Sequence, residues 1–187
     1  MNVVVIIPAK GDSKRLEKKN IRELWGKPLI EWAFDACKES KYVTDVYVST
    51  EDRAVRAVCD DNNIKVVHRD DRLCGEAYKQ KVIRDVVNQV GFLYGNDTLW
   101  VSLQANSPQV TGPMLDGAID KLLDYDRDEV FSVDPDGNQN GAFRIFRGEY
   151  VLQLDLSTNC GTYQCDVLDV HNEEDIETLS KLEVSCE

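Results

Sequence analysis

The sequence predicts an α/β fold, a doubly wound and mostly parallel sheet with helices on both faces. Short runs of β-branched and aromatic residues alternate with segments whose apolar residues recur every three or four positions. The run at residues 3–7 is apolar throughout and the run at residues 98–103 nearly so, as expected for strands that are buried on both faces of a parallel sheet. Neither an internal repeat nor a long linker interrupts this alternation, so residues 1–187 are predicted to form a single domain.

The first strand is predicted at residues 3–7, five consecutive β-branched residues that end before Pro8. Helices are predicted where apolar residues have helical spacing, at residues 28–37, 51–62, 78–93 and 114–125. Strands are predicted at the intervening apolar runs, at residues 46–50, 64–67, 98–103 and 129–133. Strand and helix thus alternate regularly up to this point.

The alternation ends at residues 134–141, a segment rich in Asp, Asn, Gly and Pro that predicts a turn. The elements expected beyond it are a strand, a loop, a short strand and a closing helix, at residues 142–146, 157–161, 167–170 and up to 182. Asn172 with Asp175 three residues later resembles a capping box at the start of the closing helix.

Charge is unevenly distributed. The net charge is −12, yet the first 27 residues carry seven Lys or Arg against three acidic residues. A duplex-binding protein normally has a basic face, so nucleic acid is not an expected partner. No apolar run approaches the ~20 residues that span a bilayer and the start lacks signal-peptide features, so we expect a soluble cytoplasmic protein without a membrane partner. A cationic loop on an acidic body indicates a small polyanionic ligand, although charge alone equally allows a solvated turn.

The loop after the first strand lies at the carboxyl end of that strand, where open α/β sheets bind ligands. The sequence contains neither the G-x-G-x-x-G motif of dinucleotide-binding proteins nor the G-x-x-x-x-G-K-[ST] motif of P-loop ATPases. The lysines of the loop after the first strand are Lys10, Lys14, Lys18 and Lys19. We expect the lysines at positions 10, 14 and 19 to neutralise a triphosphate, with backbone donors near Gly11 and the Ser13 hydroxyl adding hydrogen bonds. Such a loop suits transfer at a nucleotide phosphate. A reaction of a nucleoside triphosphate also needs Mg²⁺ held by carboxylates, and Asp169 is the best candidate for this role.

Six motifs occur in order along nearly the whole chain. They are residues 7–21 with Gly26-Lys27-Pro28-Leu29-Ile30, residues 46–52, Arg69, residues 103–108, residues 140–142 and residues 168–176. The first begins Ile7-Pro8-Ala9-Lys10-Gly11-Asp12-Ser13-Lys14 and is long and specific, whereas the others are short. Together they resemble the acylneuraminate cytidylyltransferases (CMP-sialic acid synthetases), a group of sugar-acid cytidylyltransferases with a Rossmann-like, glycosyltransferase-A-like nucleotidyltransferase fold.

The resemblance implies an enzyme in which the anomeric hydroxyl of an acidic, sialic-type sugar attacks the α-phosphate of CTP and releases pyrophosphate. The implied catalytic residues are Lys10 and Lys19, which would neutralise the triphosphate, and Asp169, which would hold Mg²⁺ or Mn²⁺ beside His171. The implied and predicted nucleotide-binding residues are Ala9, Gly11, Ser13, Lys14, Asn20 and Arg69. The predicted sugar-binding residues are Gln104 and Arg144.

The sequence also departs from the family pattern. Lys10 replaces an Arg, Asp12 a Gly, Arg144 a Tyr, and His171 the second metal-binding Asp. Relatives insert a longer excursion before the position of residue 142, which forms a swapped dimer interface and supplies basic residues for the sugar carboxylate. This sequence lacks the excursion, so it does not predict whether the chain forms the usual homodimer and the usual sugar pocket. Two alternatives therefore stand beside the enzyme: a catalytically silent relative that binds a nucleotide or sugar, and a same-fold transferase that uses another nucleotide.

Several candidate residues also have structural interpretations. Asp169 could be a turn or capping acid, and Gln104 could satisfy backbone groups at a strand end. His171 could be a surface residue ahead of the last helix. Arg144 could pair with an acid on a neighbouring strand instead of contacting the sugar.

Overall fold

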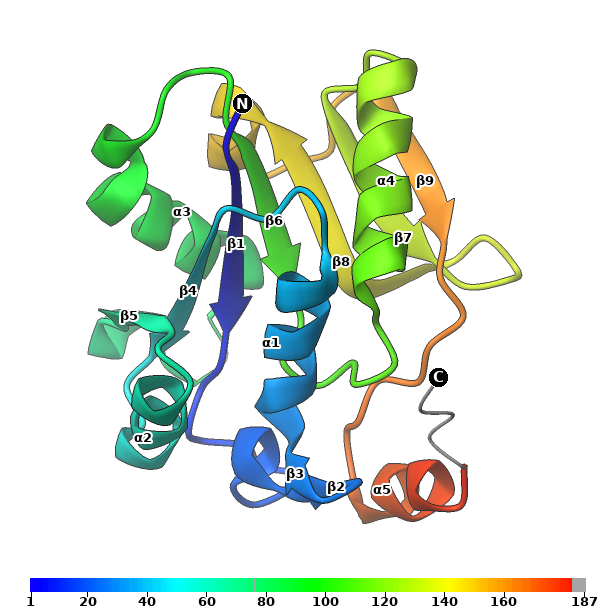
Figure 1. Cartoon of the computed structure of the whole chain (residues 1–187). Coiled ribbons are helices and arrows are strands. Elements are labelled where there is room, and N and C mark those ends of the chain that lie inside the picture. The colour runs from blue at the N-terminus through cyan, green and yellow to red at the C-terminus, as the bar shows by residue number, and fades with distance from the viewer. Residues whose placement is uncertain (76, 183–187) are drawn as a thin grey trace.

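The computed structural model describes residues 1–75 and 77–182 (Figure 1). The strands of the main sheet are β1 (Val3–Pro8), β4 (Asp45–Thr50), β5 (Lys65–His68), β6 (Leu99–Leu103), β7 (Glu129–Val133), β8 (Gln139–Arg147) and β9 (Cys160–Gln164). Across the described residues they form one seven-stranded sheet in the order β5-β4-β1-β6-β8-β7-β9. Only β8 of these strands runs antiparallel to its neighbours. The predicted mostly parallel α/β fold is confirmed.

Helices cover both faces of this sheet (Figure 1). α1 (Leu29–Glu39), α2 (Arg53–Asp61) and α4 (Gly112–Asp124) lie on one face and α3 (Lys79–Val90) lies on the other, whereas α5 (Glu173–Ser180) packs against the loop after β1. Val3, Val5 and Ile7 of β1 belong to the core that α1, α2 and α4 cover. Val4 and Ile6 belong to the other core, beneath α3. The run of β-branched residues in β1 is therefore buried on both faces, as its sequence predicts.

Short elements connect the longer ones. They are the hairpin of β2 (Glu23–Leu24) and β3 (Lys27–Pro28), and the 3₁₀ helices η1 (Lys19–Ile21), η2 (Asp71–Leu73), η3 (Gly91–Leu93) and η4 (Gly148–Leu152). The sequence analysis missed the hairpin, whose turn has positive φ at both Trp25 (50°) and Gly26 (81°). Within residues 1–75 and 77–182, none of the helices combines the length and apolar character that crossing a bilayer requires.

Two predictions near the C-terminus are wrong. Residues 157–161 are not all loop, because β9 begins at Cys160 and pairs in parallel with β7. Residues 167–170 are not a strand of the sheet. The apolar character of this segment has another cause: Val170 is buried with Leu16 and Leu179 in a small cluster against the loop after β1. β9 carries few apolar side chains, so its sequence gives little sign of a strand. It lies at the edge of the sheet and is held by backbone hydrogen bonds to β7.

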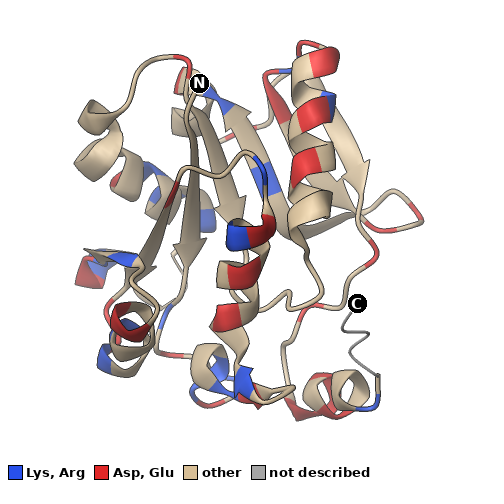
Figure 2. Ribbon diagram, viewed as in Figure 1, with Lys and Arg blue, Asp and Glu red and all other residues tan. Residues whose placement is uncertain are grey.

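Helix α5 anchors this cluster beside the loop after β1. The predicted capping box at its start is present: Asn172 accepts a hydrogen bond from the backbone of Asp175, and the Asp175 carboxylate accepts one from the backbone of Asn172. Figure 2 shows Lys and Arg gathered in the loop after β1, next to acidic positions of α5. Arg22 and Glu173 form an ion pair between the two elements. The basic loop and the segment before α5 are thereby held side by side.

Candidate functional site

The carboxyl ends of β1, β4 and β6 meet at one edge of the sheet, and the predicted site lies there. β1 pairs in parallel with β4 on one side and with β6 on the other. Ala9, just beyond β1, is buried and donates its backbone N–H to the Ser49 carbonyl oxygen at 3.0 Å. The loop that contains Lys10 therefore leaves the sheet in a fixed direction.

Gly11 is constrained by close contact with the end of β4. Its backbone N–H donates to Glu51 Oε1 at 2.7 Å. A Cβ at this position would lie 2.4 Å from Asp52 Oδ2 and 2.8 Å from Asp52 Cβ. Asp52 cannot easily move, because its carboxylate accepts hydrogen bonds from Ala54 and Val55 at the start of α2. In this structure the glycine is explained by packing against Asp52, and its predicted phosphate contact stays a prediction.

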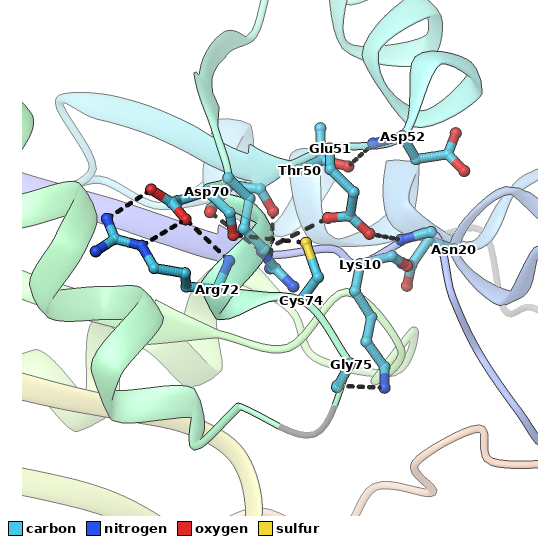
Figure 3. Close-up of polar contacts among 12 residues, drawn as sticks. Lys10, Asn20, Thr50, Glu51, Asp52, Asp70, Arg72, Cys74 and Gly75 are labelled. Carbon is cyan, nitrogen blue, oxygen red and sulfur yellow. Dashed lines mark hydrogen bonds and ion pairs between the residues drawn. The ribbon is translucent and has the colours of Figure 1, made fainter.

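Lys10 and Asn20 are linked through the backbone. The buried Asn20 side chain donates from Nδ2 to the Lys10 carbonyl oxygen at 2.8 Å. The Lys10 side chain extends toward Gly75 and donates from Nζ to its carbonyl oxygen at 2.9 Å (Figure 3). The structure thus brings two predicted residues together and fixes the direction of an ammonium group.

Arg69 is almost fully buried behind this loop, with 3% of its surface exposed. Its Nη2 donates to the Ser49 carbonyl oxygen at 2.9 Å, and its Nε lies 3.8 Å from Glu51 Oε2. These contacts support the end of β4, while the predicted nucleotide contact of Arg69 stays a prediction. Glu51 was not singled out from the sequence, although its place directly after a buried strand was the available signal.

Asp169 lies at the same edge, in an extended segment that crosses the end of β6. This segment is held by reciprocal hydrogen bonds: Val170 N–H donates to the Asn106 carbonyl oxygen at 2.8 Å, and Asn106 Nδ2 donates to the Val170 carbonyl oxygen at 2.9 Å. The Ser107 hydroxyl donates to Asp169 Oδ1. Burial raises the pKa of Asp169, opposed by the Ser107 hydrogen bond and by positive charge nearby. Asp169 is therefore a desolvated carboxylate among cations.

Two lysines approach Asp169. Burial lowers the pKa of Lys19 and the charge of Asp169 raises it, with Lys10 and Arg15 as the neighbouring cations. Burial also lowers the pKa of Lys79, which Asp169 raises and Arg144 lowers. Lys19 and Asp169 are near enough for their charges to interact, while the predicted catalytic roles of both stay predictions. Lys79 was missed, because a lysine at the start of a predicted helix carries no distinguishing signal in a single sequence.

Gln104 and Lys79 flank Gly141, which has a φ of 76° near the start of β8. The ideal Cβ position at Gly141 lies 3.6 Å from Gln104 Nε2 and 3.8 Å from Lys79 Nζ. The Gln104 backbone N–H donates to the Ala142 carbonyl oxygen at 2.9 Å. A side chain at position 141 would thus strain the backbone, while its Cβ would be in ordinary van der Waals contact with these two polar groups.

Arg144 is bound to an acid on the neighbouring strand. Its Nε donates to Glu129 Oε2 at 2.8 Å, its Nη2 contacts the same oxygen, and its guanidinium lies 4.6 Å from the centre of the Phe146 ring. Glu129 is 1% exposed. Of the two interpretations that the sequence left open for Arg144, the structure shows the ion pair, and the sugar contact stays a prediction.

The remaining predicted residues lie at the rim. Ser13 is half-buried and Lys14 is exposed, both on the loop after β1. His171 is exposed, its backbone N–H donates to Asp175 Oδ2 at 2.7 Å, and its charge lowers the pKa of Asp169. Among the described residues, no three His, Cys, Asp or Glu side chains are grouped closely enough to hold a metal by themselves.

Comparison with known proteins identifies the family. A family model described as "Cytidylyltransferase" matches residues 4–186. The chain belongs to the cytidylyltransferase family. The resemblance drawn from the loop after β1 is thus confirmed at the level of the family, and the acylneuraminate subgroup stays a prediction.

Individual relatives agree with this membership. The chain is 31% identical over 125 residues to a 3-deoxy-manno-octulosonate cytidylyltransferase of Bdellovibrio bacteriovorus, covering 66% of this chain and 47% of that protein. The chain therefore spans about half the length of the curated relatives it matches.

Solved structures show the shared fold. The structure of CMP:2-keto-3-deoxy-manno-octonic acid synthetase in complex with CTP has a TM-score of 0.77 and 16% identity, covering 96% of this chain and 97% of that one. A Mycobacterium tuberculosis protein in complex with manganese has a TM-score of 0.71 and 15% identity, covering 98% of this chain and 100% of that one.

Proposed function

We propose that this chain transfers CMP from CTP to an acidic sugar and releases pyrophosphate. The observation that carries the proposal is the meeting of Lys10, Lys19 and Asp169 at one edge of the sheet, in a member of the cytidylyltransferase family. Cations that face a desolvated carboxylate suit a triphosphate with its metal, because catalysis of nucleotidyl transfer is mostly positioning and neutralisation of charge.

In this mechanism the lysines bind and orient CTP. Within the part of the chain that the structure describes, the Lys10 ammonium donates to a neutral carbonyl alone, so phosphate oxygens would be stronger acceptors. Lys19 is disfavoured as a cation by its burial, and the negative triphosphate would relieve that cost. The anomeric oxygen of the sugar attacks the α-phosphorus, the bond from that phosphorus to the bridging oxygen breaks, and pyrophosphate leaves with the electron pair. The hydroxyl proton passes to a base or to water.

Asp169 is chemically suited to a divalent metal. One of its oxygens accepts from Ser107, and burial makes its charge costly without a cation. Mg²⁺ is commonly held by one or two carboxylates together with substrate phosphates, so a single carboxylate fits a metal that arrives with CTP. His171 is a softer donor that Mn²⁺ accepts more readily than Mg²⁺. When bound, the metal would neutralise charge on the transferred phosphate.

The acceptor is proposed to be a sugar that carries a carboxylate. The Bdellovibrio bacteriovorus relative is named for an octulosonate, which makes an octulosonate the first acceptor to test. The motif resemblance supports a sialic-type nonulosonic acid as the second. Both acceptors would use the same triphosphate-binding residues.

Pyrophosphate release tests the proposal. The purified chain is incubated with CTP, Mg²⁺ or Mn²⁺, and a panel of octulosonic and nonulosonic acids. Asp169→Asn should reduce the rate at least 100-fold, while the matched Asp166→Asn, an exposed acid on the same segment, should leave it unchanged. Absence of pyrophosphate with every acid at high protein concentration would overturn the proposed activity.

Two alternatives give different results. A silent relative would bind CTP in calorimetry without metal-dependent turnover. A transferase that uses another nucleotide would show stronger competition by that nucleotide for a labelled CTP site. Both measurements use the same preparation as the activity assay.

A further inference from the structure

Lys79 is a cation that the triphosphate mechanism does not use. It is the first residue of α3, and its side chain reaches across to β8, where Nζ donates to the Gly141 carbonyl oxygen at 3.3 Å. Among the described residues this carbonyl is its one hydrogen-bond partner, and no carboxylate forms an ion pair with it. The ammonium therefore has donors that no anion of the described chain satisfies.

The surroundings make this arrangement costly for the chain. Burial lowers the pKa of Lys79, the charge of Asp169 opposes this effect, and the neighbouring Arg144 adds to it. The first turn of a helix also disfavours positive charge, because the unpaired N–H groups there carry partial positive charge. An ammonium that hydrogen-bonds to a neutral carbonyl, as Lys79 does, gains a stronger, charged acceptor when an anionic ligand binds.

The position of Lys79 separates it from the triphosphate lysines. The cations that affect Lys19 are Lys10 and Arg15, all on the loop after β1. Lys79 instead lies beside Gln104 and Gly141, which belong to the β6 and β8 side of the site. Asp169 raises the pKa of both Lys19 and Lys79. An anion bound by Lys79 would therefore be a different group from the one that Lys19 neutralises.

We propose that the Lys79 ammonium binds the carboxylate of the acceptor sugar and makes the site selective for acidic over neutral acceptors. The inference rests on the proposed function, because it names the group that recognises the acceptor of that reaction. Gln104, whose amide nitrogen flanks the same glycine, lies close enough to contact the same sugar. The guanidinium of Arg144 is bound to Glu129, which leaves Lys79 as the cation that faces Gly141.

The test compares Lys79→Met with Lys81→Met, a matched control that removes an exposed lysine from the same helix. Loss of a charged hydrogen bond to the acceptor predicts a rise of roughly 10- to 100-fold in KM for the sugar acid in Lys79→Met. The Kd for CTP, measured by calorimetry, should stay within about twofold of the parent value, and Lys81→Met should change neither quantity. Lys79→Arg keeps the charge and should restore part of the acceptor affinity.

A second readout uses the acceptor itself. The parent chain should prefer a sugar acid over the corresponding carboxamide, and Lys79→Met should lose most of this preference. Lys79→Met exchanges a buried cation for an apolar side chain of similar length, and circular dichroism verifies that it folds. If it does not fold, the preference of the parent chain and of Lys79→Arg for acid over carboxamide decides the matter.

The outcomes separate the two proposals. If the parent chain turns over but Lys79→Met retains the KM for the acid, or loses CTP affinity instead, the role of Lys79 is refuted while the proposed function stands. If the parent chain releases no pyrophosphate, acceptor binding measured by calorimetry still tests Lys79. If the parent chain then binds no sugar acid either, both proposals fail.

Discussion

Replacing Arg144 by Met should destabilise the protein strongly while leaving acceptor recognition intact. The Arg144 guanidinium contacts Glu129 through two nitrogens, and the two side chains are 14% and 2% exposed. Glu129 also accepts a hydrogen bond from the Ser157 backbone, so its charge cannot leave the interior by a simple rotation. Removal of one partner of such a pair leaves a buried charge, at a cost of about 3–5 kcal/mol.

The assay is equilibrium unfolding in urea with a parallel thermal melt. For a chain of this length the loss corresponds to a fall of roughly 6–20 °C in Tm. The double variant Arg144→Met/Glu129→Gln should recover more than about 2 kcal/mol of that loss, because its interior carries no charge and the Gln oxygen still accepts from Ser157. If Arg144→Met instead loses less than about 1 kcal/mol and raises KM for the sugar acid, the guanidinium serves the acceptor and the ion pair is not the reason for its presence.

Three further predictions concern the edge of the sheet. Asp169→Asn should stabilise the metal-free protein at neutral pH while abolishing activity. Because burial raises the folded-state pKa of Asp169, the folded state retains the proton more readily than the unfolded state, and stability falls as pH rises from the unfolded value near 4 through the raised folded value. The gain from Asp169→Asn, measured by urea unfolding in a chelator, should accordingly vanish as pH falls below about 4, and a gain that is equal at every pH contradicts burial as its cause. Gly11→Ala should cost about 1–3 kcal/mol and weaken CTP binding, because its Cβ collides with the Asp52 side chain that caps α2. Gly91→Ala is its control, since that Cβ meets nothing closer than 3.5 Å, and an equal loss in both would exclude the collision as the explanation. Lys19→Met should weaken CTP binding at least 10-fold in calorimetry, whereas Lys38→Met, on the exposed side of α1, should not; equal effects would point to net charge rather than to contact.

The sequence predicts the sheet well where strands are buried on both faces. Residues 3–7 are apolar throughout and residues 98–103 nearly so, and the two runs become neighbours in the centre of the sheet. It fails where pairing depends on the backbone alone, as in β9, and where apolar residues are buried outside the sheet, as at Val170. Periodicity reports burial, and burial does not reveal which neighbour provides it.

The site is predictable to a similar extent. Lys10, Lys19 and Asp169 were predicted because a basic loop follows the first strand and because the motifs match a family. Glu51, Ser107 and Lys79 were not, since each acts through contacts with residues at least 40 positions away in the chain. For Arg144 the sequence left two interpretations open, and the ion pair with Glu129 depends on the register of β7 and β8, which the sequence does not reveal.

The segment before α5 connects the position of Asp169 to the apolar packing around it. Asp169 lies between Leu168 and Val170, whose backbone N–H groups are both bound by the loop after β6. Val170 in turn packs with Leu16 of the basic loop and Leu179 of α5. Burial disfavours the charges of Asp169, Lys19 and Lys79, while the opposite charges of Asp169 and the two lysines partly offset that cost. The apolar cluster and the Asn106 hydrogen bonds hold the backbone of the Asp169 segment at this edge, which gives a preorganised arrangement of charge whose remaining cost a bound anion and its metal would relieve.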